Sequence, residues 1–213
     1  MENKDVLLHR LCEDANEWQS SVRLLPFDKI FFQHRFHVNS GFCCAMFDYL
    51  PYSSEIVPDI EQRNVRDAIL DFKKGVDPRI FADLMAAAAA GERMLFLEPE
   101  TVLFCIPAAT IEKHEKRFKA FSRALAENLG IIDGFPMLRV IADREQNGKK
   151  ILPLKDSVRL DDPEGMLKDR PVTIVDDVYT KGGSFISMSE LLTAAGAKSV
   201  TGLFFACSIG RTE

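Results

Sequence analysis

Several common structural devices are missing from this chain of 213 residues. Its five cysteines are odd in number and include no Cys-x-x-Cys pair. This pattern argues against both a zinc site and a framework of disulfides. Cys105 and Cys207 lie in apolar runs and are interpreted as small core residues. The adjacent Cys43 and Cys44 are interpreted as partly buried structure.

Long apolar runs and an excess of basic residues are also absent. No stretch approaches the roughly 20 apolar residues that a membrane-spanning helix needs. The first five residues lack the basic-then-apolar form of a signal peptide. The net charge of −5 argues against nonspecific binding of nucleic acid as the main role. We therefore expect a cytoplasmic protein with no membrane partner and no nucleic-acid partner.

What the chain does have is an alternation of strand-like and helix-like segments. From residue 101 onward the order is strand, helix, strand, long loop, strand, helix, strand. Such alternation predicts an α/β fold, with a mostly parallel central sheet flanked by helices. The strands are expected at 101–106, 137–141, 172–175 and 200–207, and 154–170 is expected to be loop.

The N-terminal part is predicted as a small α+β appendage over 1–60, followed by the α/β core over 61–213. Residues 5–19 have helical apolar spacing, and the aromatic-rich stretch 31–52 is expected to hold a hairpin. His34 and His37 there could bind a metal, although packed or exposed imidazoles are commoner. In the core, two helices are expected at the start: one over 65–74 capped by Asn64, and one over 80–90 begun by Asp77 and Pro78.

The run from Pro171 to Ser184 is the most informative part of the sequence. A short apolar strand is followed by Asp176 and Asp177, and then by a glycine turn that leads into a helix. In an open parallel sheet, ligands bind beyond the carboxyl ends of the strands. A helix N-terminus reached through glycines offers bare N–H groups to a phosphate. Two carboxylates suit sugar hydroxyls, or a metal ion carrying them, so the expected ligand is a phosphorylated ribose.

This segment closely resembles the phosphoribosyl-pyrophosphate (PRPP) signature of type I phosphoribosyltransferases. That signature is an apolar strand, two acidic residues, and a Thr/Gly-rich loop ending in Thr or Ser. Residues 172–184 fit it at nearly every position. Lys181 departs from it, because many members have a small hydroxyl residue there. An ordinary turn with surface aspartates is the alternative interpretation.

The resemblance implies a phosphoribosyltransferase, that is, a pentosyltransferase with Mg²⁺ as cofactor. Asp176 and Asp177 become the catalytic residues, holding the ribose hydroxyls directly or through Mg²⁺ and its water. Their negative field would favour the cationic transition state. Lys181 either adds charge at the phosphate or points into solvent. The loop that would bind the 5-phosphate and the sugar comprises Val178, Tyr179, Thr180, Lys181, Gly182, Gly183 and Ser184.

The same resemblance places a pyrophosphate site after the first core strand. The turn formed by Pro107, Ala108 and Ala109 occupies that position in the chain. From the basic cluster that follows, Lys113, Lys116 and Arg117 could stabilise the leaving group. Arg144 begins a polar stretch, 144–150, that lies where the family has a closing loop. A solvated helix face and a plain surface loop are the alternatives.

A fainter resemblance to the ComF-like branch, named for bacterial competence proteins, extends over residues 64–207. The chain lacks the N-terminal Cys-x-x-Cys pairs usual in that branch. That absence argues against a zinc module and a competence role. The resemblance itself makes a non-catalytic PRPP- or nucleotide-binding accessory protein the second hypothesis. An interaction module with an incidental acidic pair is the third. The acceptor base is expected under a hood formed by 1–60. Its identity, the pathway and the oligomeric state stay open, with a homodimer allowed. Five aromatic residues of the hood could stack on a base: Phe31, Phe32, Phe36, Phe42 and Phe47.

Overall fold

The computed structural model describes Val6, His9, Leu11 and residues 18–92, 95, 97–146, 149–162 and 165–209. Most of the helix expected over 5–19 lies outside these residues. Leu11 and Trp18, which belong to it, are buried. None of the helices in the described part of the chain has the length and apolarity needed to cross a membrane.

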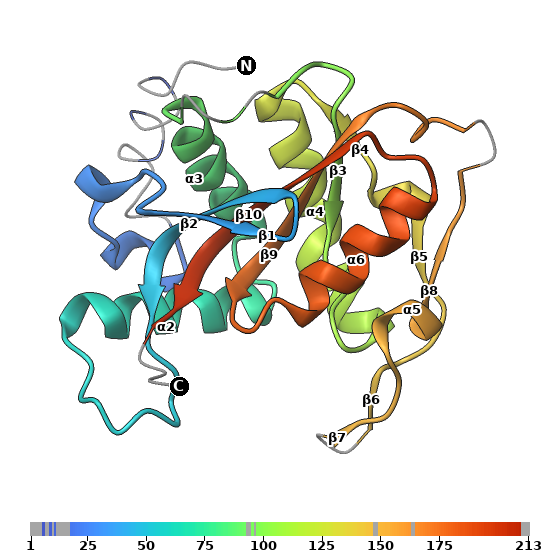
Figure 1. Ribbon diagram of the computed structural model, residues 1–213. Helices are drawn as coiled ribbons and strands as arrows, with labels where there is room; N and C mark the ends of the chain where they lie inside the picture. Colours follow the sequence, from blue (N-terminus) through green and yellow to red (C-terminus); the bar gives the residue numbers. More distant parts are fainter. Residues whose placement is uncertain are drawn as a thin grey trace.

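A six-stranded sheet forms the centre of the molecule, in the order β1-β2-β10-β9-β3-β4 (Figure 1). Only the β1–β2 pair is antiparallel, and every other neighbouring pair is parallel. The α/β fold with a mostly parallel sheet is thus confirmed. The strands are β1 (His34–Val38), β2 (Gly41–Tyr49), β3 (Val102–Cys105), β4 (Ile132–Asp133), β9 (Pro171–Tyr179) and β10 (Ser199–Ser208).

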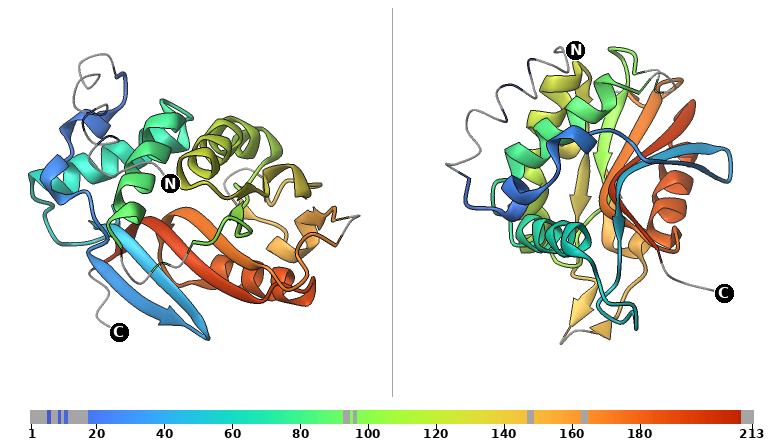
Figure 2. Two further views of the ribbon diagram at one scale, coloured as in Figure 1. Left: turned by 90° about the horizontal axis from the view of Figure 1, so that it is seen from above. Right: turned by 90° about the vertical axis from the view of Figure 1, so that its left-hand side faces the viewer.

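Helices cover both faces of this sheet (Figure 2). One face carries α2 (Ile60–Lys73), α3 (Pro78–Ala90) and α4 (Ile111–Leu129), and the other carries α6 (Gly183–Ala194). A separate apolar core lies on each side. The alanine-rich α3 is mostly buried, because small side chains allow it to pack closely against α4. The remaining short helices are η2 (Ser21–Leu24), η3 (Phe27–Lys29), η4 (Phe135–Met137) and α5 (Leu154–Ser157).

Helix α2 begins earlier than its sequence predicts. Its N-cap is Asp59, whose carboxylate accepts from the Gln62 amide while the Gln62 side chain accepts from the Asp59 amide. This capping box satisfies two N–H groups that would otherwise lack partners, so the helix starts there and not after Asn64. Asn64 instead lies inside the helix and donates to the carbonyl of Leu24. Val65, Ile69 and Phe72, at helical spacing, form its buried face.

The strand expected at 137–141 does not belong to the main sheet. Its observed counterpart, β5 (Leu138–Val140), pairs antiparallel with β8 (Val158–Leu160) in a separate two-stranded sheet. The strand that follows α4 in the main sheet is β4, only two residues long. It ends because Gly134 turns the chain, donating to the Leu103 carbonyl at 2.9 Å. The expected loop 154–170 was also wrong in part, since it contains α5 and β8.

The predicted N-terminal hairpin is present and joins the main sheet. Strand β2 runs parallel to β10, with Asp48 opposite Cys207. The hairpin turn holds Asn39 in the left-handed region, at φ 53°. The sheet is therefore common to both predicted parts of the chain, 1–60 and 61–213.

The connections place a topological switch point between β3 and β9. From β3 the chain crosses through α4 to β4, toward one edge of the sheet. From β9 it crosses through α6 to β10, toward the other edge, and α6 lies on the opposite face from α4 (Figure 2). The loops after two such strands diverge, which leaves a crevice at their carboxyl ends where ligands bind in open α/β sheets.

Candidate functional site

The acidic pair lies at this switch point, within the strand. Strand β9 was expected to end at Val175, but it continues to Tyr179 because β10 pairs with it as far as Cys207. Strand β3 stops opposite Val175. Asp176 and Asp177 therefore extend past the end of β3, where one side of β9 has lost its neighbour and opens into the crevice.

The loop after β9 encloses a cavity of about 360 Å³ at the N-terminus of α6. The helix begins at Gly183, and no side chain caps it. The first N–H groups of a helix have no partner within the helix, so this end of α6 can donate to an anion in the cavity. The structure brings the whole predicted phosphate loop to this cavity, together with the first aspartate. The lining residues are Ile106, Asp176, Phe185, Phe204 and the seven residues from Val178 to Ser184.

The two loop glycines have different tasks. Gly182 has φ 75°, and a Cβ on it would lie 2.5 Å from the Tyr179 hydroxyl, so this position needs glycine on both counts. Gly183 is not in the left-handed region, and a Cβ there would meet nothing within 4 Å. A side chain at Gly183 would therefore stand in the cavity without straining the backbone. Lys181 is exposed at the tip of the loop and also lines the cavity.

A second cavity of about 440 Å³ lies on the other side of the acidic pair. It shares Ile106, Asp176 and Ser184 with the first, so the two form one continuous depression. Its walls include the predicted turn and a set of basic side chains from three parts of the chain. These residues are Pro107, Ala108 and Ala109, with Lys73, Lys74, Lys113, Arg117 and Arg144.

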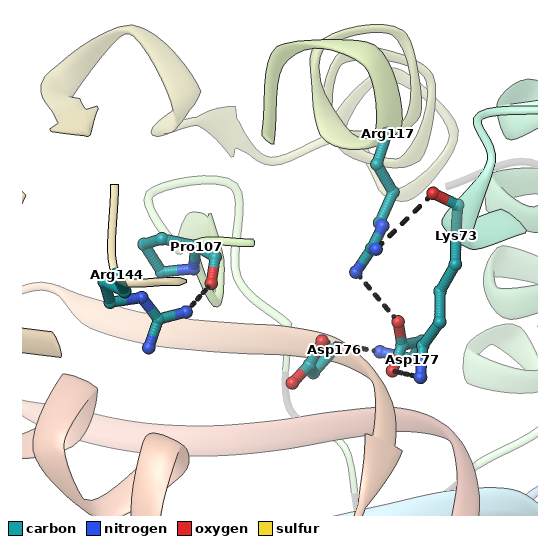
Figure 3. A network of polar contacts seen from close by, with 6 residues as sticks. All are labelled: Lys73, Pro107, Arg117, Arg144, Asp176 and Asp177. Atoms are coloured by element: carbon teal, nitrogen blue, oxygen red, sulfur yellow. Dashed lines mark hydrogen bonds and ion pairs between the residues drawn. The ribbon is translucent and has the colours of Figure 1, made fainter. Parts of the chain in front are cut away.

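Asp177 points toward α2 and α4 and is held by two cations (Figure 3). Arg117 Nη1 lies 3.0 Å from its Oδ2, and Lys73 Nζ lies 3.6 Å from its Oδ1. The side chains of Arg117 and Asp177 are only 11% and 8% exposed. Lys73, at the last turn of α2, was missed by the sequence analysis. Its charge and place at a helix end were visible, but nothing in the sequence showed that α2 would end beside β9.

Asp176 has a different environment from its neighbour. One of its oxygens, Oδ1, accepts from the Asp177 amide at 2.8 Å, and its side chain lines both cavities. Burial, followed by the negative charge of Asp177, raises the pKa of the Asp176 carboxyl well above its ordinary value of 3.8. A ligand group that supplies hydroxyl donors or positive charge at Asp176 would relieve this cost.

Arg144 braces the turn after β3. Its guanidinium donates to the Pro107 carbonyl, and its backbone amide donates to the Ala109 carbonyl at 2.7 Å (Figure 3). The stretch that follows forms a small hairpin, β6 (Glu145–Gln146) with β7 (Lys149–Lys150). Asp143 accepts from the Ile111 amide at the start of α4. Arg144 is thus buried in the wall of the second cavity. The stretch predicted as a closing loop contains the β6–β7 strand pair, which directly follows Arg144.

Lys116 and the nearby His114 do not line the second cavity. Lys116 is exposed and does not line the cavity, and its side chain packs beside Gly75. His114 is buried against Phe135, with ring centroids 5.0 Å apart, and burial lowers its pKa to about 4. Helical geometry explains why Lys116 and His114 point elsewhere. Lys113 and Arg117 are four residues apart and therefore share the face of α4 that meets the acidic pair.

The aromatic residues of the predicted hood are divided between core and surface. Phe32 and Phe47 are fully buried, while Phe31 is largely exposed. Phe36 packs on Tyr179, with centroids 4.6 Å apart, and so supports the wall of the first cavity. None of the five lines either cavity.

The donor set suits a hard cation carried by a ligand better than a cation held by protein alone. No group of three or more His, Cys, Asp or Glu in the described ranges is arranged to hold a metal ion. Asp176 offers carboxylate oxygen at the cavity, whereas both oxygens of Asp177 already face cations. Magnesium prefers oxygen ligands and keeps several waters, so a phosphate-bound Mg²⁺ fits beside Asp176. His34, considered above as a metal ligand, lies 2.8 Å from Asp48 instead.

Comparison with known proteins does not extend this description. No family model matches the chain, and no curated protein matches it.

Proposed function

We propose that this protein is a phosphoribosyltransferase that binds PRPP with Mg²⁺ and transfers the phosphoribosyl group to or from a base or amine. One observation carries the proposal. The acidic pair lies between an uncapped helix N-terminus on one side and a cavity lined with basic side chains on the other. This order of charges is complementary to a ligand with a monophosphate at one end, a diol in the middle and a diphosphate at the other end.

Each part of the site then has a task in the transfer. The N–H groups at the start of α6, with the hydroxyls of Thr180 and Ser184, hold the 5-phosphate. Asp176 and Asp177 bind the ribose hydroxyls, and their negative field stabilises the positive charge that develops on the ribose ring. The turn 107–109 and the basic side chains around it receive the departing pyrophosphate. When bound, Mg²⁺ neutralises part of the diphosphate charge.

A second function is a binding protein of the ComF-like type, which would hold PRPP or a nucleotide without turnover. The observation that favours it is the engagement of both cavity arginines by protein groups, Arg117 by Asp177 and Arg144 by Pro107. A protein that only binds PRPP does not need an unpaired cationic side chain to stabilise departing pyrophosphate.

Pyrophosphate release distinguishes the two functions. PRPP with Mg²⁺ is incubated with the protein and a panel of purine, pyrimidine and simple amine acceptors, and pyrophosphate is measured. Acceptor-dependent release that is lost in Asp176→Asn supports the transferase. Tight PRPP binding without release for any acceptor supports the binding protein. A protein that binds no ribose phosphate at all is neither, and is then better regarded as an interaction module.

A further inference from the structure

The basic residues around the second cavity fall into two groups. Arg117 is enclosed: besides its bond to Asp177, its Nη2 donates to the Lys73 carbonyl at 3.5 Å. Its guanidinium carbon also lies 5.4 Å from the centroid of the Phe118 ring. The bond to Asp177 directs the guanidinium toward β9, while the Lys73 carbonyl on α2 takes a second donor (Figure 3).

Lys74 and Lys113 are held much more loosely. Their side chains are 67% and 51% exposed, and each lies 3.8 Å from a carboxylate, that of Asp71 or Glu145. Exposed ion pairs at this distance contribute little and exchange readily. Both lysines line the cavity, so they can turn toward an incoming anion at low cost.

We propose that Arg117 is a positioning residue for Asp177, and that exposed Lys113 and Lys74 contact the diphosphate in its place. The inference rests on the proposed function, because it divides the work within that site. A guanidinium bound to a carboxylate has fewer donors left for a second anion, and moving it would leave a buried Asp177 with Lys73 alone. Arg117 thereby keeps Asp177 correctly oriented for the ribose hydroxyls.

The charges facing Asp177 explain why it needs this support. Asp176 is its immediate neighbour on β9 and repels it when ionised. Lys73 from α2 and Arg117 from α4 are the cations within ion-pair distance of it. Without Arg117, Asp177 keeps the contact with Lys73 at 3.6 Å beside the neighbouring carboxyl group of Asp176. Asp177 would then lose the contact that fixes its rotamer, and the diol would lose one of its acceptors.

Two ligands separate positioning from direct contact with the diphosphate. Ribose 5-phosphate has the diol and the monophosphate only, whereas PRPP has the diphosphate as well. Calorimetry with each ligand, in the presence of Mg²⁺, compares Arg117→Met with Lys113→Met, one turn away on the same helix. We expect Arg117→Met to weaken both ligands by the same factor, at least about tenfold. Lys113→Met should weaken PRPP and leave ribose 5-phosphate nearly unchanged.

A double-mutant cycle tests whether Arg117 acts through Asp177. In the Asp177→Asn background, replacing Arg117 should have little further effect on ribose 5-phosphate binding, because the carboxylate that it orients is gone. Thermal unfolding of each variant verifies that it is folded. Should Arg117→Met fail to fold, Arg117→Lys keeps the charge and is expected to weaken both ligands equally, by a smaller factor.

Two adverse results are distinguishable. If an Arg117 variant loses affinity for PRPP and binds ribose 5-phosphate like the wild type, Arg117 contacts the diphosphate and the inference is overturned. If the wild-type protein binds neither ligand, the proposed function itself fails.

Discussion

Two neighbouring aspartates have unequal environments, and this inequality is the main result at the scale of single residues. Asp177 is fixed by Arg117 and Lys73, whereas Asp176 faces the cavities with no cation bound to it in the described part of the chain. The sequence indicates that both carboxylates matter but cannot distinguish them. Their difference depends on α2 and α4, which lie far away in the chain and end beside β9 only in the folded protein.

The two aspartates should therefore differ in their effect on stability. The pKa of Asp176 is raised on folding, so its contribution to the free energy of unfolding falls as pH rises above the ordinary range near 3.8. Asp176→Asn should raise the melting temperature at about pH 8, with a smaller gain at about pH 5. Asp177→Asn should lower the free energy of unfolding by about 1–3 kcal/mol, because Arg117 and Lys73 lose their charged partner. Denaturant unfolding at both pH values measures this, and equal effects of the two substitutions would contradict it.

The glycines make a second prediction at this scale. Gly183→Val should leave the fold intact, because a Cβ there meets nothing within 4 Å. The valine side chain should instead fill part of the cavity at the N-terminus of α6. We expect at least a ~100-fold loss of PRPP affinity from lost N–H contacts. Gly182→Ala should instead destabilise the protein by about 1–2 kcal/mol, since it combines positive φ with a close approach to Tyr179.

Thr193→Val, at the exposed far end of α6, is the control for Gly183→Val. It adds a β-branched apolar side chain to the same helix without entering the cavity. A Gly183→Val protein that binds PRPP as well as Thr193→Val does would mean that the N-terminus of α6 does not hold the phosphate.

The local sequence predicts helices and strands well where a single set of residues determines the backbone conformation. It predicts their boundaries poorly where two residues could each serve as the helix cap. The β9–loop–α6 unit was predictable because apolar strand, acidic pair and glycines follow in order. The start of α2 was misplaced because Asn64 and Asp59 are both acceptable caps, and only Gln62 completes a box with Asp59. Strand β5 was assigned to the wrong sheet because its apolar alternation does not reveal its partner, β8.

The observed start of α2 is testable through its cap. Asp59→Ala removes an acceptor for the Gln62 amide and should cost about 1 kcal/mol in the free energy of unfolding. Asn64→Ala, which removes the amide donor to Leu24, should cost less, because it leaves the capping box intact. Chemical denaturation compares the two. A larger effect at Asn64 would favour the later helix start.

At the scale of the whole molecule, the site results from the crossing pattern of a six-stranded sheet. The opposite courses of α4 and α6 separate the loops after β3 and β9, and the acidic pair lies in the opening between them. The sequence predicts the parallel sheet and the residues of the phosphate loop. It does not predict that β2 joins β10, because the hairpin has no local signal for its partner. Nor does it predict which basic residues reach the cavity, since that depends on helix rotation.

Isothermal titration calorimetry of the wild-type protein with PRPP and Mg²⁺ tests the central claim most directly. We expect saturable binding at a stoichiometry of about one per chain. Ribose 5-phosphate should bind more weakly, because it cannot reach the basic side chains of the second cavity. Absence of heat, together with no shift in melting temperature at ligand concentrations in the millimolar range, would contradict the account. The switch-point crevice would then not be a site for phosphorylated ribose.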